Sequence, residues 1–140
     1  MNNQHGLSTV DLMIVAAAFF MVAALAVPRF AFLSEEARVD SVRNLAEDVR
    51  ASAELTYRVW DSAGRPKTLR TSGETLELAY GFPTKVSVGA VVMDDSEFLF
   101  DNGVWHFADK RKKIENCFVS YEAPRSAAER PLITANVDGC

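Results

Sequence analysis

The sequence predicts an α+β fold, in which a long N-terminal α-helix packs on a small antiparallel β-sheet and the C-terminus forms a disulfide-closed loop. Three observations lead to this prediction. An apolar run from Leu12 to Val27 continues into an amphipathic helical pattern. Short strand patterns separated by turn residues follow it. The chain has two cysteines, Cys117 and Cys140, and both lie near its C-terminal end.

The first half of the expected helix, residues 7–33, is apolar enough for us to expect it in a membrane. Its core, Leu12 to Val27, contains about 16 apolar residues, and apolar positions on either side bring it toward the roughly 20 that span a bilayer. Alanine is frequent in this core, and small residues let helices approach closely in apolar surroundings. A secretory signal peptide has a similar core, so ordinary secretion with cleavage near Ala24 to Ala26 is an alternative.

The second half of the expected helix is amphipathic. Pro28 lacks a backbone N–H donor and is expected to kink or loosen the helix near the end of the apolar run. From Ser34 onward, apolar residues with helical spacing form one stripe: Val39, Val42, Ala46, Val49, Ala53 and Trp60. We expect this stripe to pack against the sheet, and we expect Gly64 and Pro66 to end the helix.

Strand patterns occupy the rest of the chain. The clearest is a hairpin around Asp101-Asn102-Gly103, because Asn-Gly tolerates the positive φ angles of a tight hairpin turn. Segment 86–93 is compatible with either a helix or a strand. The expected strands are 75–80, 98–100, 104–107, 117–121 and 132–137.

Two cysteines allow one intramolecular pairing, Cys117 with Cys140. The disulfide would close a loop of about 24 residues and contribute roughly 3 kcal/mol through loop-closure entropy. It requires an oxidising compartment, which fits a domain exported across a membrane. The alternative is that the two cysteines are buried and remain as free thiols.

Composition argues against several functional classes. The formal net charge of −4 does not suit wholesale nucleic-acid binding. The two histidines, His5 and His106, are far apart and have no partner cysteines at metal-binding spacing. His106 lies between Trp105 and Phe107 in a strand pattern, so we expect it to point outward from the sheet. No nucleophile-elbow, phosphate-loop or dinucleotide motif is present. We therefore predict no enzymatic activity, no cofactor and no metal.

The run Lys110-Arg111-Lys112-Lys113 is the strongest charge feature. It follows the expected hairpin and precedes a strand, so one interpretation is a solvated turn. The other is a local contact for acidic partners, such as DNA, lipid head groups, acidic polysaccharide or an acidic patch of a neighbouring subunit. No aromatic residue lies within the run, so base stacking and specific nucleic-acid recognition are not predicted.

A single acidic residue, Asp11, begins the apolar run five residues after Gly6. An ionisable group at the edge of a membrane span is costly unless it is paired, and is therefore a functional-site hypothesis. Its natural partner is the α-amine of Leu7, which cleavage after Gly6 would create. Ser8 and Asp11 also fit a helix capping box, and this local role is compatible with the pairing.

These residues resemble the type IV pilin signature: Gly6, an acid five residues later, an apolar run, and Pro28 at its far end. Asp11 stands where that family nearly always has Glu, and Leu7 stands where Phe is usual. Further segments resemble the mannose-sensitive haemagglutinin type of pilin: Val27-Pro28-Arg29-Phe30, residues 33–38, Tyr80-Gly81-Phe82-Pro83, and the C-terminal pattern of Cys117, Tyr121, Pro131, Gly139 and Cys140.

The resemblance implies three regions and a filament. Residues 1–6 would be a leader peptide, 7–33 the transmembrane and filament-core half of the helix, and 34–140 the globular region. A prepilin peptidase would cut after Gly6 and methylate Leu7. The subunit would reside in the bacterial inner membrane with its globular region in the periplasm, until assembly machinery adds it to an extracellular pilus.

Attachment and biofilm formation are the expected outputs of such a homopolymer. Two related functions stay open: a type II secretion pseudopilin, and a low-copy minor pilin that binds DNA or a receptor.

Overall fold

A computed structural model describes the backbone of residues 9–71, 73–93 and 95–140, and the side chains of these ranges from Ser34 onward. The chain divides into two units, Met1–Glu36 and Ala37–Cys140. We call the second unit, which contains all the strands, the head. Within it, one helix packs on antiparallel sheets, so the predicted α+β class is confirmed for this part of the chain.

Helix α1 comprises Thr9–Ser62. In the head, its buried face follows the predicted stripe, with Val42, Ala46, Val49 and Ala53 all buried. Leu45 is also buried and widens the stripe. The half-buried Trp60 lies at the margin of the stripe, where its ring covers Gly81 so closely that a Cβ there would collide with it.

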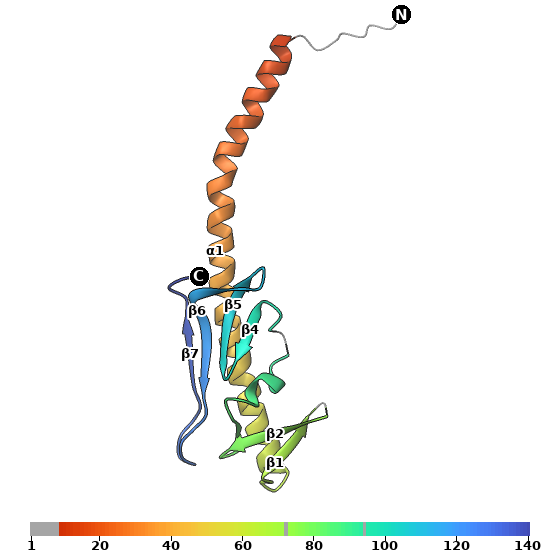
Figure 1. Cartoon of the computed structure of the whole chain (residues 1–140), viewed down its shortest axis with the longest axis vertical. Coiled ribbons are helices and arrows are strands. Elements are labelled where there is room, and N and C mark those ends of the chain that lie inside the picture. Colours follow the sequence, from red (N-terminus) through yellow and green to blue (C-terminus); the bar gives the residue numbers. More distant parts are fainter. Residues whose placement is uncertain (1–8, 72, 94) are drawn as a thin grey trace, which may run out of the picture. The chain divides into compact units, whose positions relative to one another are not determined.

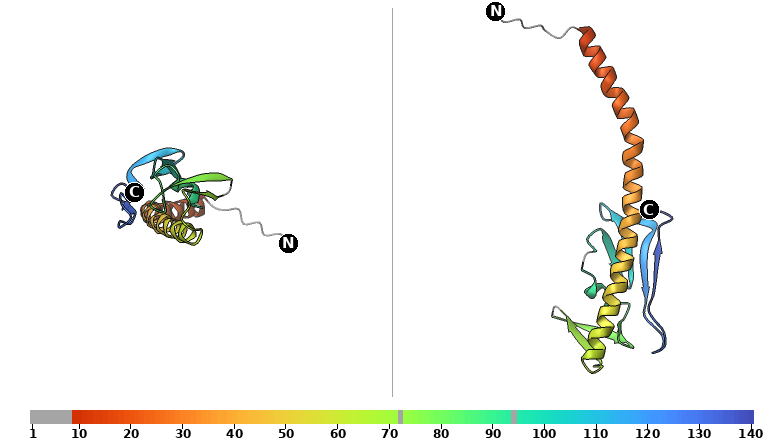
Figure 2. Two further views of the ribbon diagram at one scale, coloured as in Figure 1. Left: turned by 90° about the horizontal axis from the view of Figure 1, so that it is seen from below. Right: turned by 180° about the vertical axis from the view of Figure 1, so that it is seen from behind.

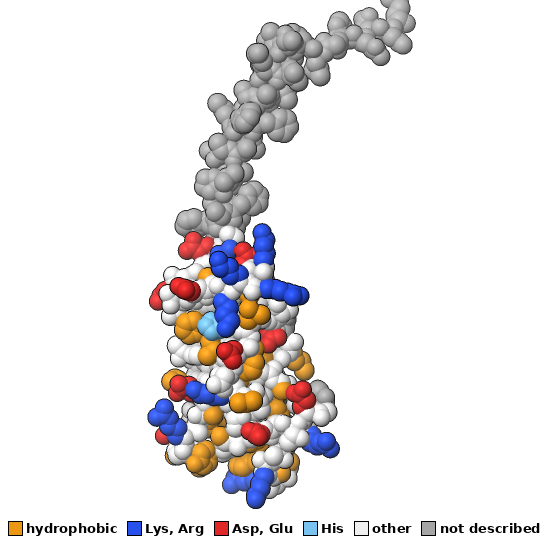
Figure 3. All heavy atoms as spheres, in the orientation of Figure 1, with side chains coloured by type: hydrophobic (Ala, Val, Ile, Leu, Met, Phe, Trp, Pro, Cys, Tyr) orange, Lys and Arg blue, Asp and Glu red, His pale blue; other side chains and the backbone are white. Residues whose placement is uncertain are grey.

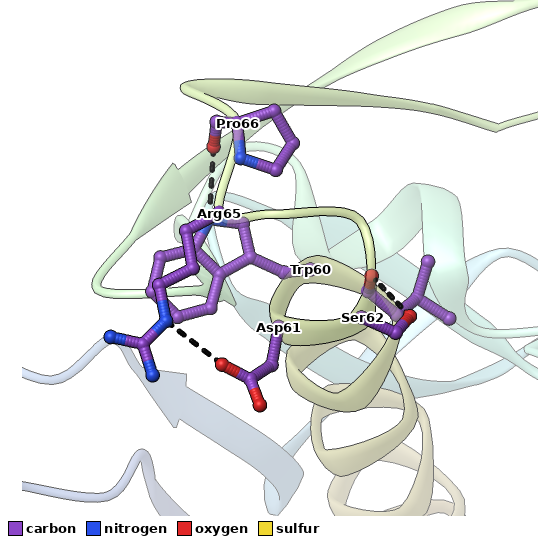
Figure 4. Close-up of polar contacts among 6 residues, drawn as sticks. Trp60, Asp61, Ser62, Arg65 and Pro66 are labelled. Carbon is purple, nitrogen blue, oxygen red and sulfur yellow. Dashed lines mark hydrogen bonds and ion pairs between the residues drawn. The ribbon is translucent and has the colours of Figure 1, made fainter.

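The helix ends where Gly64 and Pro66 predict, and it does so with a Schellman motif. Gly64 has a φ of 83°, its N–H donates to the carbonyl of Asp61, and the N–H of Arg65 donates to the carbonyl of Trp60. Side chains reinforce the turn (Figure 4): Arg65 Nε donates to Asp61 Oδ1 at 2.8 Å, and Trp60 Nε1 donates to the Pro66 carbonyl at 2.9 Å. The stop signal is therefore local and readable from sequence.

The larger sheet is a four-stranded antiparallel meander in the order β4-β5-β6-β7. Its strands lie along the helix (Figure 1), and the view from behind shows α1 in front of them (Figure 2). The strands are β4 (Phe98–Asp101), β5 (Val104–Asp109), β6 (Lys112–Glu122) and β7 (Leu132–Asn136).

The β4–β5 hairpin confirms the sequence prediction. Asp101 pairs with Val104 across a two-residue turn, in which Asn102 and Gly103 have φ angles of 45° and 84°. Positive φ at both central residues defines a type I′ turn. Strand β6 differs from the prediction, since it begins at Lys112 and includes the second half of the basic run.

The structure has two sheets where the sequence analysis predicted one, and the second sheet has three strands. It has the order β1-β2-β3 and contains β1 (Thr68–Thr71), β2 (Glu74–Ala79) and β3 (Phe82–Pro83). Only the segment of β2 was predicted as a strand. The undecided segment 86–93 contains neither an α-helix nor a strand, but the 3₁₀ helix η1 (Val88–Val91).

One hydrophobic core serves the helix and both sheets. Trp105 and Val119, from neighbouring strands of the larger sheet, are completely buried in it together with Val42 of the helix. Tyr121 is buried as well, and its hydroxyl donates to the Pro83 carbonyl at 2.7 Å. Burial raises the pKa of this hydroxyl, so it remains a neutral donor. The hydrogen bond joins the last strand of the smaller sheet to the larger sheet.

The C-terminal segment is fastened to the head by the predicted disulfide. Cys117 and Cys140 are bonded, with their Cα atoms 4.8 Å apart, and both are buried. The Gly139 N–H donates to the Asn116 carbonyl at 2.9 Å, and Arg38 Nη1 donates to the main-chain oxygen of Cys140 at 3.1 Å. We call the disulfide and these two hydrogen bonds the C-terminal clasp.

Reduction of the disulfide should lower the free energy of unfolding by about 3 kcal/mol, because the unfolded chain regains the entropy of an open loop. Urea unfolding of the full chain in a mild detergent, followed by tryptophan fluorescence with and without reductant, measures the difference. The variant C117S/C140S is the control and should be insensitive to reductant. Identical midpoints for the oxidised and reduced wild-type protein would contradict a stabilising role.

Candidate functional site

The residues expected to act in assembly fall outside the side chains that the structure describes. Gly6 and Leu7 precede the first described residue. Positions 11 and 28 are helical in backbone, but the side chains of Asp11 and Pro28 lie outside the described residues. The roles of these four residues, and the kink expected at Pro28, remain predictions.

Among the residues whose side chains are described, no helix is long and apolar enough to cross a membrane. The apolar run from Leu12 to Val27 is outside that set. The same described residues contain no group of three or more His, Cys, Asp or Glu side chains able to hold a metal ion.

The basic run forms the tip of the β5–β6 hairpin. Asp109 pairs with Lys112 across a two-residue turn made by Lys110 and Arg111, whose φ angles are 48° and 67°. This turn has the same type I′ geometry as the one at Asn102-Gly103. Two long cationic side chains therefore occupy positions that favour Asn and Gly.

All four basic residues of the tip are exposed. In the part of the head with described side chains, none of them forms an ion pair with an acidic side chain. We call Lys110, Arg111, Lys112 and Lys113 the cationic tip. Figure 3 shows Lys and Arg side chains projecting from the end of the head that is uppermost in that view. The run thus forms an exposed turn at Lys110 and Arg111, whereas Lys112 and Lys113 begin a strand. Whether it contacts an acidic partner stays a prediction.

His106 lies on the outer face of the larger sheet, as the sequence pattern predicts. It alternates with the buried Trp105 and Phe107, and its ring centroid is 5.7 Å from that of Phe118 on β6. Partial burial, followed by the positive charge of Lys113, lowers the pKa of His106. The histidine is therefore neutral at pH 7 and adds no charge to the cationic tip.

Sequence reasoning missed an apolar groove of about 500 Å³ between the last turns of α1, the β1–β2 hairpin and η1. Its lining includes Leu55, Val59, Leu69, Leu76 and Met93. Leu55 and Met93 are largely exposed, at 63% and 102% of their reference areas. The i,i+4 pair Leu55 and Val59, off the main stripe, was the sequence signal that could have indicated a second apolar face on α1.

The variant K110N/R111G gives the β5–β6 turn the Asn-Gly sequence of the β4–β5 turn. This change should raise the free energy of unfolding by about 1 kcal/mol. The reason is that non-glycine side chains in the left-handed region carry a steric penalty of roughly that size. Urea unfolding of the full chain in detergent gives the value. The control N102K places lysine in the other turn and should lower stability; equal stability of K110N/R111G and wild type would show that the turn is unstrained.

No protein-family model, no curated protein and no solved structure matches this chain.

Proposed function

We propose that this chain is the structural subunit of a type IV pilus filament, of the mannose-sensitive haemagglutinin type, serving surface attachment and biofilm formation. The proposal starts from the N-terminal sequence, in which Gly6 and Asp11 precede an apolar run of helical composition. Cleavage after Gly6 would make Leu7 the first residue of the mature subunit.

The observation that carries the proposal is that one helix, α1, contains both the apolar run and the stripe that packs in the head. This helix begins at Thr9, contains the whole apolar run, and ends at Ser62 after supplying the buried stripe of the head. A filament subunit needs both features, because its helix must leave the bilayer, pack among copies of itself and still hold the head.

The head supports the same proposal. The disulfide between Cys117 and Cys140 suits a domain that folds after export into an oxidising compartment. The exposed apolar groove also suits a polymer, because contiguous apolar surface on a soluble domain commonly marks an interaction site. Packing of heads along a filament would supply neighbours to cover it.

In the proposed mechanism, Asp11 neutralises the Leu7 amine of a neighbouring subunit. Two unit charges about 4 Å apart attract by roughly 4 kcal/mol at an effective dielectric constant of about 20. Neither charge is stable alone in apolar surroundings, so the pair favours one axial register between neighbouring helices.

The intact mass of the protein in sheared surface filaments tests the proposal directly. We expect a chain that begins at Leu7, heavier by one methyl group when the new N-terminus is methylated. Copy number in the same preparation separates a major subunit from a low-copy minor one. A chain that retains Met1 and stays in the membrane fraction would replace the filament proposal with an anchored periplasmic domain.

The variant D11A should reduce filament yield at least tenfold, since losing even about 1.4 kcal/mol per contact changes an equilibrium by that factor. Electron microscopy and quantitation of sheared filaments measure the yield. The matched variant D11E keeps the charge and should still assemble.

Trypsin resistance of the head should be the same in D11A, D11E and wild type, because the substitution lies outside the head. Normal filaments from D11A would refute the charge-pairing mechanism while leaving the filament proposal itself intact.

A further inference from the structure

We propose that the cationic tip contacts the phosphate groups of anionic phospholipids while the subunit is held in the membrane before assembly. This inference depends on the membrane residence assumed in the proposed function. It assigns a role to the four exposed cations of the head in the stage before assembly.

A chain of contacts fixes the position of the cationic tip within the head. Arg38 on α1 donates to the main-chain oxygen of Cys140, and Cys140 is bonded to Cys117 on β6. Farther along β6, Tyr121 donates to the Pro83 carbonyl. Phe82, beside Pro83, stacks on Tyr57 near the end of α1, with ring centroids 4.8 Å apart.

These contacts show that β6 and the head's part of α1 run in the same direction. The start of β6, which contains Lys112 and Lys113, therefore lies at the end of the head where Arg38 lies. Figure 1 shows the β5–β6 turn at that end of the sheet.

The covalent chain limits the distance between the apolar segment and the head. The apolar segment 7–33 ends five residues before Arg38, and five fully extended residues span at most about 18 Å. This limit holds for any orientation of the segment. If that segment lies in a bilayer, the chain tethers the Arg38 end of the head within that distance of the segment's end, and the cationic tip lies at this same end of the head.

The charge of the cationic tip favours contact with an anionic membrane. Each Lys or Arg close to an anionic membrane strengthens surface binding by about fivefold, and the effect fades within a Debye length. The tip carries four such charges without an ion-pair partner in the described part of the head. The neighbouring acids Asp109 and Glu115 are exposed and reduce the local charge without cancelling it.

A flat lipid surface suits these features better than a long soluble polyanion. The chain has a formal net charge of −4, which opposes wrapping by DNA or an acidic polysaccharide. A bilayer meets one end of the head, and the cationic tip lies at the Arg38 end. The tip also has no aromatic side chain for stacking on bases.

Lysine acylation of the full chain in reconstituted vesicles tests the inference. The vesicles contain either phosphatidylcholine alone or phosphatidylcholine with about 30% phosphatidylglycerol, whose anionic head groups give the bilayer a negative surface potential. We expect Lys110, Lys112 and Lys113 to be acylated at least threefold more slowly in the anionic vesicles. High salt should abolish the difference, because it screens exposed charges.

Lys67 and Lys85 are internal controls. Both are exposed, Lys67 follows the C-terminal end of α1, and Lys85 lies beside Glu122 at 3.8 Å, at the far end of β6. Their acylation rates should be the same in the two kinds of vesicle.

Two matched variants, each lacking two positive charges, sharpen the test. In K112Q/K113Q, protection of Lys110 by anionic vesicles should be lost. In K67Q/R70Q, whose substitutions lie at the other end of the head, that protection should persist.

Equal acylation of the tip lysines in both vesicles would overturn the inference. Protection that arises only when DNA or heparin is added would overturn it too, in favour of a soluble polyanion. Flotation of the vesicles at high salt reports membrane residence separately, because an inserted helix resists salt. Failure to float would refute both proposals, whereas flotation without protection would refute only the lipid contact.

Discussion

The head depends on one physical constraint, the burial of a single face of α1 beneath two sheets. Val42 and Val49 are completely buried, and full burial of such a side chain contributes about 1.5 to 3 kcal/mol. Ala46 and Ala53 lie on the same buried face, and their small side chains leave room for larger residues of the core. Trp105 can then be fully buried opposite the helix, with its indole N–H bonded to Asp95 at 3.2 Å. Both sheets contribute side chains to this shared core, and packing against a helix is one of the ways in which small sheets become stable.

The two hairpin turns of the larger sheet have the same backbone geometry, but their residues differ in the conformational free energy needed to adopt it. Asn102-Gly103 suits positive φ, whereas Lys110-Arg111 adopts it against the preference of both side chains. Neighbouring strands and the core hold the second turn in place, because β5 and β6 are paired on both sides of the irregularity between His106 and Ala108. Asn and Gly would make the second turn more stable than Lys110 and Arg111 do. Strained residues that are retained at the cost of stability are associated with function rather than with folding.

Local signals were readable from the sequence, and long-range ones were not. The Asn102-Gly103 turn and the Gly64 helix end were predicted because a few adjacent residues determine them. The strand at Thr68–Thr71 was missed because its residues, Thr-Leu-Arg-Thr, include one apolar side chain and pair only through β2. The division into two sheets was missed for the same reason: strand pairing depends on tertiary contacts. The groove was missed because Leu55 and Val59 become neighbours of Met93 only after η1 has folded beside the helix.

The candidate sites divide along the same line. Cys117 and Cys140 were paired correctly because two cysteines leave one connectivity. Arg38 was not singled out, since its bond to Cys140 joins residues 102 positions apart. This hydrogen bond adds a second connection to the segment that the disulfide holds. The covalent link holds the C-terminal segment on β6, while Arg38 ties the same segment to the helix, so the clasp joins helix and sheet at the end of the head where the cationic tip lies. The end of the head that displays the cationic tip is therefore held together both by a covalent bond and by the hydrogen bonds of the clasp.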